Sequence, residues 1–161
     1  MADLTVTITE AVTLNGASRG STNTLTIAGV DDIYHRIVTV PADAENTTLV
    51  AFKTAQTDAD GAIDRDLVKY IRVTNMESSN PVILNIQQQE AEHASNAGDQ
   101  NLAVQLSAKK SFMLGEAHDC IDVEGGANDI DALSNLHDVE SIMVDPLAAE
   151  CRVEIFIASV V

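Results

Sequence analysis

The chain has 161 residues, of which 45% are hydrophobic and 3% aromatic, with no tryptophan. This length predicts one domain, and the apolar share argues against wholesale disorder. The 25 Asp and Glu against 9 Lys and Arg give a formal charge of −16, which repels phosphate backbones and anionic membranes, so we expect neither nucleic acid nor a membrane as a partner.

The first predicted elements are strands with a period of two. Within Leu4–Thr9 and again within Asn23–Ile27, leucine, valine or isoleucine alternates with threonine. Such alternation places one face of a strand on a core and the other in water. Turn residues Asn15-Gly16 and Arg19-Gly20-Ser21 stand between the runs. The opening of the chain therefore predicts β-structure with a threonine-rich outer face.

Further runs continue to the C-terminus, and no long segment has a helical period. The eleven predicted strands are Leu4–Thr9, Ala11–Leu14, Asn23–Ile27, Tyr34–Val40, Thr48–Lys53, Leu67–Thr74, Pro81–Ile86, Leu102–Leu106, Ser111–Leu114, Ser141–Val144 and Cys151–Ala158. Many short strands joined by turns predict an all-β fold, an antiparallel β-sandwich or jelly-roll-like barrel of about 8–11 strands with little helix. Short helical turns could occupy Asp129–Leu136 or Pro146–Glu150.

No composition shift divides the chain, which predicts a single β-sandwich domain over residues 1–161. The polar stretch Gln87–Gln100 lies between two predicted strands and is expected to form an extended hairpin loop. Cys151 is in phase with apolar neighbours and is expected to be a buried thiol, although a bridge to Cys120 stays possible. The start of the chain lacks the basic and apolar regions of a signal peptide, and no apolar run is long enough to span a bilayer.

An acidic segment follows the predicted strand Ser111–Leu114. Between Ser111 and Cys151 there is no Lys or Arg, but there are ten acids: Glu116, Asp119, Asp122, Glu124, Asp129, Asp131, Asp138, Glu140, Asp145 and Glu150. If these carboxylates share a face, that face repels its own copies unless a cation or a basic partner covers it.

Candidate chemistry is sparse. Gln56–Leu67 contains Asp58 and Asp60 before a glycine, as in a calcium loop, but lacks the first aspartate and the final glutamate of an EF-hand. The dipeptides His118-Asp119 and His137-Asp138 lack the spacing of a metal site or a catalytic base. No nucleophile, phosphate-loop or zinc motif occurs. We therefore expect a protein that is not an enzyme, with no catalytic residue, no cofactor and no metal centre beyond weak divalent cations.

Several stretches in order resemble a family of small structural proteins of tailed bacteriophages, especially those infecting marine cyanobacteria. The stretches are Val6–Gly16 with Arg19–Thr22, Tyr70–Asn75, Leu106–Phe112 and Glu154–Ser159. They are strand and turn patterns rather than an active site. The resemblance covers most of the chain in order, excluding the Gln87–Gln100 loop and the acidic region Glu116–Pro146.

The resemblance implies a virion protein, and the lack of a shaft or long anchor favours a capsid decoration (cement) protein on the outer surface of the phage head. Its expected partners are the major capsid protein and its own copies, as a homotrimer. A tail, baseplate or fibre-tip component and a carbohydrate- or ligand-binding β-sandwich are the alternatives. The candidate contact residues are Thr5, Thr7, Thr9, Arg19, Asp119, Asp122, Glu124, Asp129 and Asp131.

Overall fold

A computed structural model of the protein describes residues 2–53, 63–88, 100–115 and 139–160. The regular structure in these ranges is β-strand with one short 3-10 helix, η2 (Arg65–Leu67). The strands are β1 (Ala2–Thr9), β2 (Thr13–Leu14), β3 (Ala17–Ser18), β4 (Thr22–Val30), β5 (Asp32–Val40), β6 (Thr47–Lys53), β7 (Ile63–Asp64), β8 (Val68–Asn75), β9 (Val82–Gln88), β10 (Gln100–Leu106), β11 (Ser111–Gly115), β12 (Val139–Asp145) and β13 (Cys151–Ser159).

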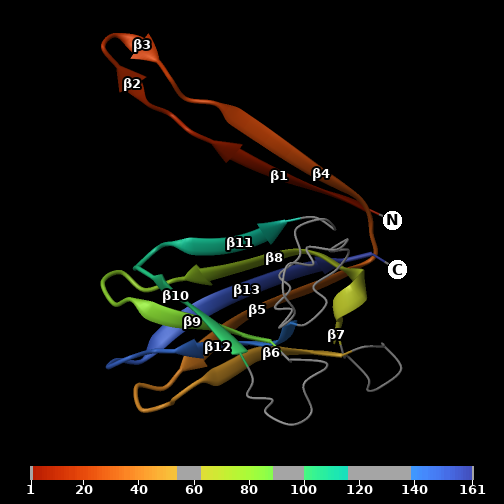
Figure 1. Cartoon of the computed structure of the whole chain (residues 1–161), viewed down its shortest axis with the longest axis vertical. Coiled ribbons are helices and arrows are strands. Elements are labelled where there is room, and N and C mark those ends of the chain that lie inside the picture. The colour runs from red at the N-terminus through yellow and green to blue at the C-terminus, as the bar shows by residue number, and fades with distance from the viewer. Residues whose placement is uncertain (1, 54–62, 89–99, 116–138, 161) are drawn as a thin grey trace, which may run out of the picture.

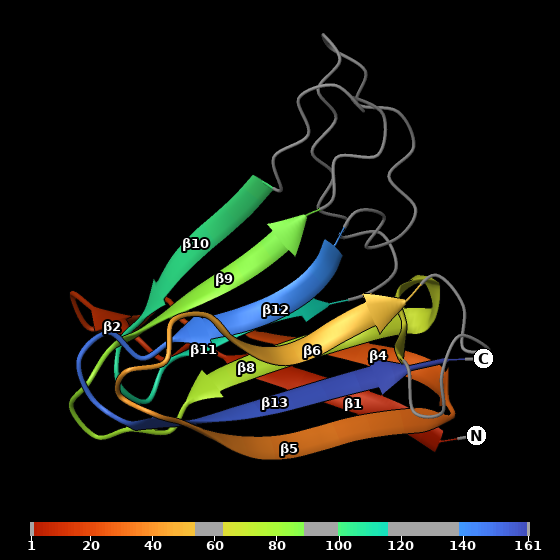
Figure 2. The same cartoon turned by 90° about the horizontal axis from the view of Figure 1, so that it is seen from below.

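Nine of these strands form two sheets that stack face to face (Figures 1 and 2). The five-stranded sheet has the order β10-β9-β12-β6-β7, and the four-stranded sheet has the order β11-β8-β13-β5. Neighbouring strands run antiparallel, except that the two-residue strand β7 runs parallel to β6. The predicted antiparallel β-sandwich is therefore confirmed.

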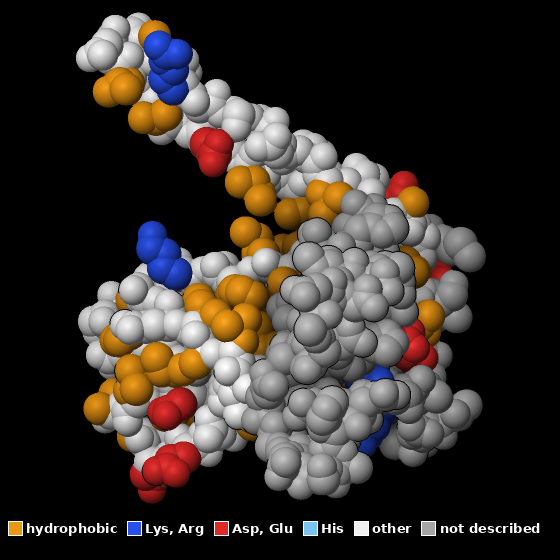
Figure 3. Space-filling model, viewed as in Figure 1, with side chains coloured by type: hydrophobic (Ala, Val, Ile, Leu, Met, Phe, Trp, Pro, Cys, Tyr) orange, Lys and Arg blue, Asp and Glu red, His pale blue; other side chains and the backbone are white. Residues whose placement is uncertain are grey.

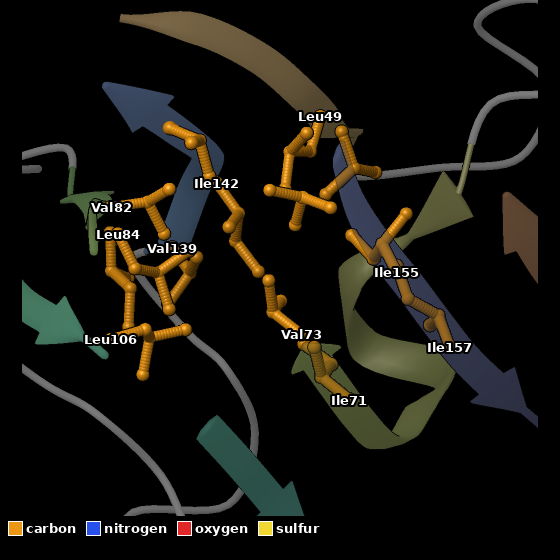
Figure 4. Packing of buried hydrophobic residues seen from close by; sticks show 14 of the residues in the cluster. Leu49, Ile71, Val73, Val82, Leu84, Leu106, Val139, Ile142, Ile155 and Ile157 are labelled. Carbon is orange, nitrogen blue, oxygen red and sulfur yellow. The ribbon is translucent and has the colours of Figure 1, made fainter. Parts of the chain in front are cut away.

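The core lies between the two sheets because alternate side chains of each central strand point inward. On β13, Val153, Ile155 and Ile157 are all 0% exposed, and Cys151 continues the same row at 1%. Figure 4 shows Ile142 of the five-stranded sheet among the core side chains that meet those of the four-stranded sheet. Each fully buried aliphatic side chain contributes about 1.5–3 kcal/mol. The core is built from aliphatic residues, as the low aromatic content requires.

All eleven predicted strands are present, with shifted ends and two additions. The two-residue strands β3 and β7 escaped prediction because two residues carry no visible alternation. Leu67 belongs to η2 rather than to β8. Residues 146–150 were expected to form a helical turn, but they form a non-helical turn in which Leu147 has a positive φ of 64°. Cys151 is buried, as expected.

Several expectations fall on residues that the structure does not describe. These are the calcium-like residues Asp58 and Asp60, both His-Asp dipeptides, the helical turn at Asp129–Leu136 and the bridge from Cys120. The Gln87–Gln100 loop is described only at its ends, where β9 and β10 pair through Gln88 and Gln100. In the part of the chain that is described, no helix has the length and apolar character needed to cross a bilayer.

Residues 2–30 form an arm that projects from the sandwich (Figure 1). Strands β1 and β4 pair as a two-stranded antiparallel ribbon, and β2 and β3 pair at its tip. The tip turns through Asn15 and Gly16, with φ of 52° and 77°, as a two-residue turn of type I′ requires. None of the arm strands pairs with a sandwich strand among the described residues.

Candidate functional site

The outward face of the arm is a ladder of threonines. Cross-strand pairing places Thr5 opposite Thr26, Thr7 opposite Thr24 and Thr9 opposite Thr22, and all six side chains are exposed. The two hydroxyl oxygens are 3.5 Å apart in the Thr7–Thr24 pair and 3.4 Å apart in the Thr9–Thr22 pair. Methyl and hydroxyl groups thus cover this face without any charge.

The opposite face of the arm is apolar, because directly paired residues point to the same side of a ribbon. It places Leu4 opposite Ile27 and Val6 opposite Leu25. Near the base these side chains pack against Tyr70 and other residues of the four-stranded sheet and its C-terminal end, forming a second hydrophobic cluster. The base of the arm is therefore anchored to the outer face of that sheet.

Toward the tip the apolar side chains of the arm are exposed and do not belong to this cluster. Ile8 is 46% exposed, Val12 52% and Leu14 59%. Figure 3 shows an open space between the outer part of the arm and the sandwich, with hydrophobic side chains on the arm beside it. Isolated exposed apolar residues are ordinary, whereas here three of them lie on one projecting element.

Two backbones approach closely where the ribbon passes into the tip. The Glu10 amide donates to the Ser21 carbonyl at 2.8 Å, and the Ser21 hydroxyl donates to the Glu10 carboxylate at 2.8 Å. A Cβ on Gly20 would lie 1.9 Å from the Glu10 carbonyl oxygen, so only glycine fits at this position. This junction fixes the direction of the tip relative to the ribbon.

A polar row crosses the outer face of the four-stranded sheet. The Glu154 carboxylate lies 2.8 Å from His35 and accepts a hydrogen bond of 2.7 Å from Arg72. The same Arg72 nitrogen donates to Thr74 at 2.7 Å, and the Thr74 hydroxyl lies 2.8 Å from that of Ser111. The hydrogen bonds from Arg72 first, and then from His35, lower the pKa of Glu154. The row links all four strands.

The aromatic residues offer no exposed ring. Tyr34, Phe112 and Phe156 are half-buried, and Phe52 and Tyr70 are buried, which accounts for all five aromatic residues of the chain. The Phe156 ring packs 6.1 Å from that of Tyr70 and 5.7 Å from that of His35. A stacking platform for a sugar ring, which a carbohydrate-binding surface commonly uses, is therefore missing from these residues.

The candidate contact residues of the sequence divide between two places. Thr5, Thr7 and Thr9 lie on the outward face of the arm, and Arg19 is exposed just after β3. The five acids of the candidate set, from Asp119 to Asp131, lie outside the described residues. The exposed apolar residues of the tip were not among the candidates, because a period-two pattern does not say what covers the apolar face.

Charge is unevenly divided along the chain. All nine Lys and Arg residues belong to the described ranges, together with thirteen acids, whereas the other twelve acids belong to 54–62, 89–99 and 116–138. The described residues therefore carry a formal charge of −4 and the remainder −12, which sums to −16. The acidic excess is thus concentrated in three connections between strands.

Comparisons with known proteins add little. Neither the protein-family models nor the curated proteins contain a match. Among solved structures, the chain is similar to a family 11 carbohydrate-binding module from Clostridium thermocellum in complex with a β-1,3-1,4-mixed-linked tetrasaccharide. The identity is 9%, the match covers 99% of this chain and 85% of that chain, and the TM-score is 0.29. A likeness of this size carries no functional argument.

Proposed function

We propose that the protein is a non-catalytic structural module that attaches to a protein surface through its N-terminal arm. The observation that carries the proposal is the projecting arm, on which Ile8, Val12 and Leu14 are exposed. A two-stranded ribbon is marginal in water by itself, and exposed apolar side chains gain free energy when another surface covers them.

The resemblance to phage structural proteins supports a phage capsid as the surface that the arm contacts. On this proposal the chain is a capsid decoration protein on the outer face of a phage head, where it contacts the major capsid protein and stabilises the shell. A rigid sandwich with a projecting arm suits this role, because the sandwich remains outside while the arm extends over a neighbouring subunit. Its ten-acid region would complement a basic patch on the shell.

The test is attachment of tip variants to phage heads that lack the protein. Leu14→Asp should reduce particle occupancy by at least about tenfold, because a buried contact would have to accommodate a charge. Leu147→Asp is the matched control, because Leu147 is also exposed, at 50%, but lies in the turn between β12 and β13. Equal occupancy of Leu14→Asp and wild type would contradict attachment through the tip.

The location on the particle separates decoration from the tail alternative. A cryo-EM map of the complete particle should show the sandwich over the capsid shell. Density at the tail, baseplate or fibre tip would instead identify the protein as a tail component. Retention on a glycan array, abolished by substitutions in the sandwich but not in the arm, would favour the carbohydrate-binding alternative.

A further inference from the structure

The strand β5 is an open edge of the four-stranded sheet. It pairs with β13 through nine consecutive residues, from Asp32 opposite Ser159 to Val40 opposite Cys151, with no register shift. No described strand pairs with its other side. Natural sheet edges are commonly protected by a proline, a bulge or several lysines, and β5 has none of these. Its outward backbone groups are therefore available to another strand.

The side chains of this edge are also unusual. Ile33 and Ile37 are 52% and 56% exposed, although both belong to a regular strand of the sandwich. They lie four residues apart on the outer face of the sheet, on either side of His35. An antiparallel strand of matching pattern would cover both at once.

Local charge does not oppose a second copy at this edge, in spite of the overall charge of −16. Asp32 and Arg36 balance each other on β5 itself. The four-stranded sheet as a whole carries four basic and two acidic residues, a formal charge of +2. They are Arg36, Lys69, Arg72, Arg152, Asp32 and Glu154.

We propose that two copies of the chain pair antiparallel through β5, with a two-fold axis at His35, in place of the homotrimer that the phage resemblance implies. In this register Ile33 lies opposite the partner subunit's Ile37, and Tyr34 lies opposite the partner subunit's Arg36. The second contact repeats one within the chain, where the Arg36 guanidinium carbon lies 4.9 Å from the centre of the Tyr34 ring. Pairing of this kind is β-augmentation with an identical strand.

The neighbouring registers are less favourable. A two-fold axis at Arg36 places the two Arg36 side chains directly opposite each other, which like charge disfavours. An axis at Tyr34 places Ile37 opposite the partner subunit's Asp31 and leaves its apolar surface poorly matched. A shift of the register by an odd number of residues would place side chains from the outer face of one sheet opposite side chains from the inner face of the other. The axis at His35 alone brings the two exposed isoleucines together.

The pairing adds to the proposed function a way for two arms to bind together, and this addition rests on that proposed function. A two-fold axis perpendicular to the sheet keeps the outer faces of both copies on the same side. Both arms then project toward one surface, so that the second arm binds at a high effective concentration once the first is attached. The pairing itself depends only on β5 and can be tested without any particle.

Sedimentation of the free protein measures the pairing. Wild type should form a dimer between about 1 and 100 µM, and Ile37→Lys should weaken that dimer by at least about tenfold. Met113→Lys is the matched control, because Met113 is 43% exposed on β11, at the opposite edge of the same sheet. A monomer throughout this range, or a trimer that Ile37→Lys leaves unchanged, would overturn the proposal.

Cross-linking tests the register. The double variant Ile33→Cys/Ile37→Cys should form disulfide-linked dimers under mild oxidation, because positions 33 and 37 of the two copies face each other. Each single variant should give only the background of the native cysteines. Linkage that is as strong in a single variant refutes the axis at His35. The Leu14→Asp variant should keep its dimer, so that failure of arm attachment and failure of β5 pairing are distinguishable.

Discussion

Arg72 on β8 donates a hydrogen bond of 2.7 Å to Glu154 on β13, and the Glu154 side chain is 20% exposed. The two residues join the central strands of the four-stranded sheet on its outer face. The hydrogen bond from Arg72 is the largest cause of the lowered pKa of Glu154, and the one from His35 comes next. The charged form of Glu154 is therefore stabilised in the folded protein relative to the unfolded chain.

The first prediction concerns pH. Because the folded pKa of Glu154 is lowered, its contribution to stability is present above the unfolded pKa and is lost as pH falls through the folded pKa. Glu154→Gln should lower the free energy of unfolding at neutral pH by about 1–2 kcal/mol, and the difference should shrink in acid. Urea unfolding of wild type and Glu154→Gln from pH 2.5 to 7 measures this difference in the free energy of unfolding. Arg72→Gln should remove most of the same pH dependence, and a difference that stays constant with pH would contradict the prediction.

The second prediction concerns Asn75, which is fully buried at the end of β8. Its amide donates to the Asn80 carbonyl at 2.8 Å and to the Leu106 carbonyl at 3.1 Å, and its side-chain oxygen accepts from the Glu77 amide at 3.0 Å. Asn75→Ala leaves these backbone groups unpaired and should destabilise the fold by about 2–4 kcal/mol in urea unfolding. The exposed Asn101→Ala on β10 should change stability by less than about 0.5 kcal/mol.

The third prediction concerns the junction of the arm. Gly20→Ala introduces a Cβ into the space beside the Glu10 carbonyl, so the two backbones must separate. We expect faster amide hydrogen exchange through the arm, with little change in the melting temperature of the sandwich, because the junction has no part in the sandwich core. Gly115→Ala is a control, because its Cβ would meet no backbone atom, only the side chains of Leu25 at 3.2 Å and Tyr70 at 3.8 Å. Unchanged exchange at Glu10 and Ser21 would refute the steric argument.

The fourth prediction concerns salt. The charge of −16 should oppose self-association, so dimerisation should strengthen as the Debye length falls from about 10 Å at 0.1 M to about 3 Å at 1 M. Attachment to a basic shell patch should weaken over the same range. Replacing Asp119, Asp122 and Glu124 by amides should reduce both effects. If particle occupancy and dimerisation are both independent of salt, the acids act as separate solvated charges.

The sequence allowed the sandwich strands to be predicted because their apolar alternation is strong and their turns are marked. It did not allow the arm to be separated from the sandwich. Leu4–Thr9 and Ser141–Val144 are both predicted as strands, yet Ser141–Val144 lies in a buried central strand while β1 is mostly exposed. The difference comes from long-range pairing, which local periodicity does not encode.

The candidate site was predictable only in part. The threonines of β1 were identified, but their pairing with those of β4 required the register of the ribbon. The row from His35 to Ser111 joins residues from four strands, and nothing in their spacing along the chain brings them together. The open edge at β5 likewise depends on sheet order, because Tyr34–Val40 carries the same strand signal whether it lies at an edge or inside a sheet.

The position of β13 has a consequence for synthesis of the protein. This strand lies between β8 and β5, so the four-stranded sheet stays divided until residues 151–159 have left the ribosome. Ala158, on which the base of the arm packs, belongs to the same strand. The arm is therefore translated first and anchored last. During that interval its apolar face and the β5 edge are open to other nascent chains, and copies made on one messenger could meet there before either is complete.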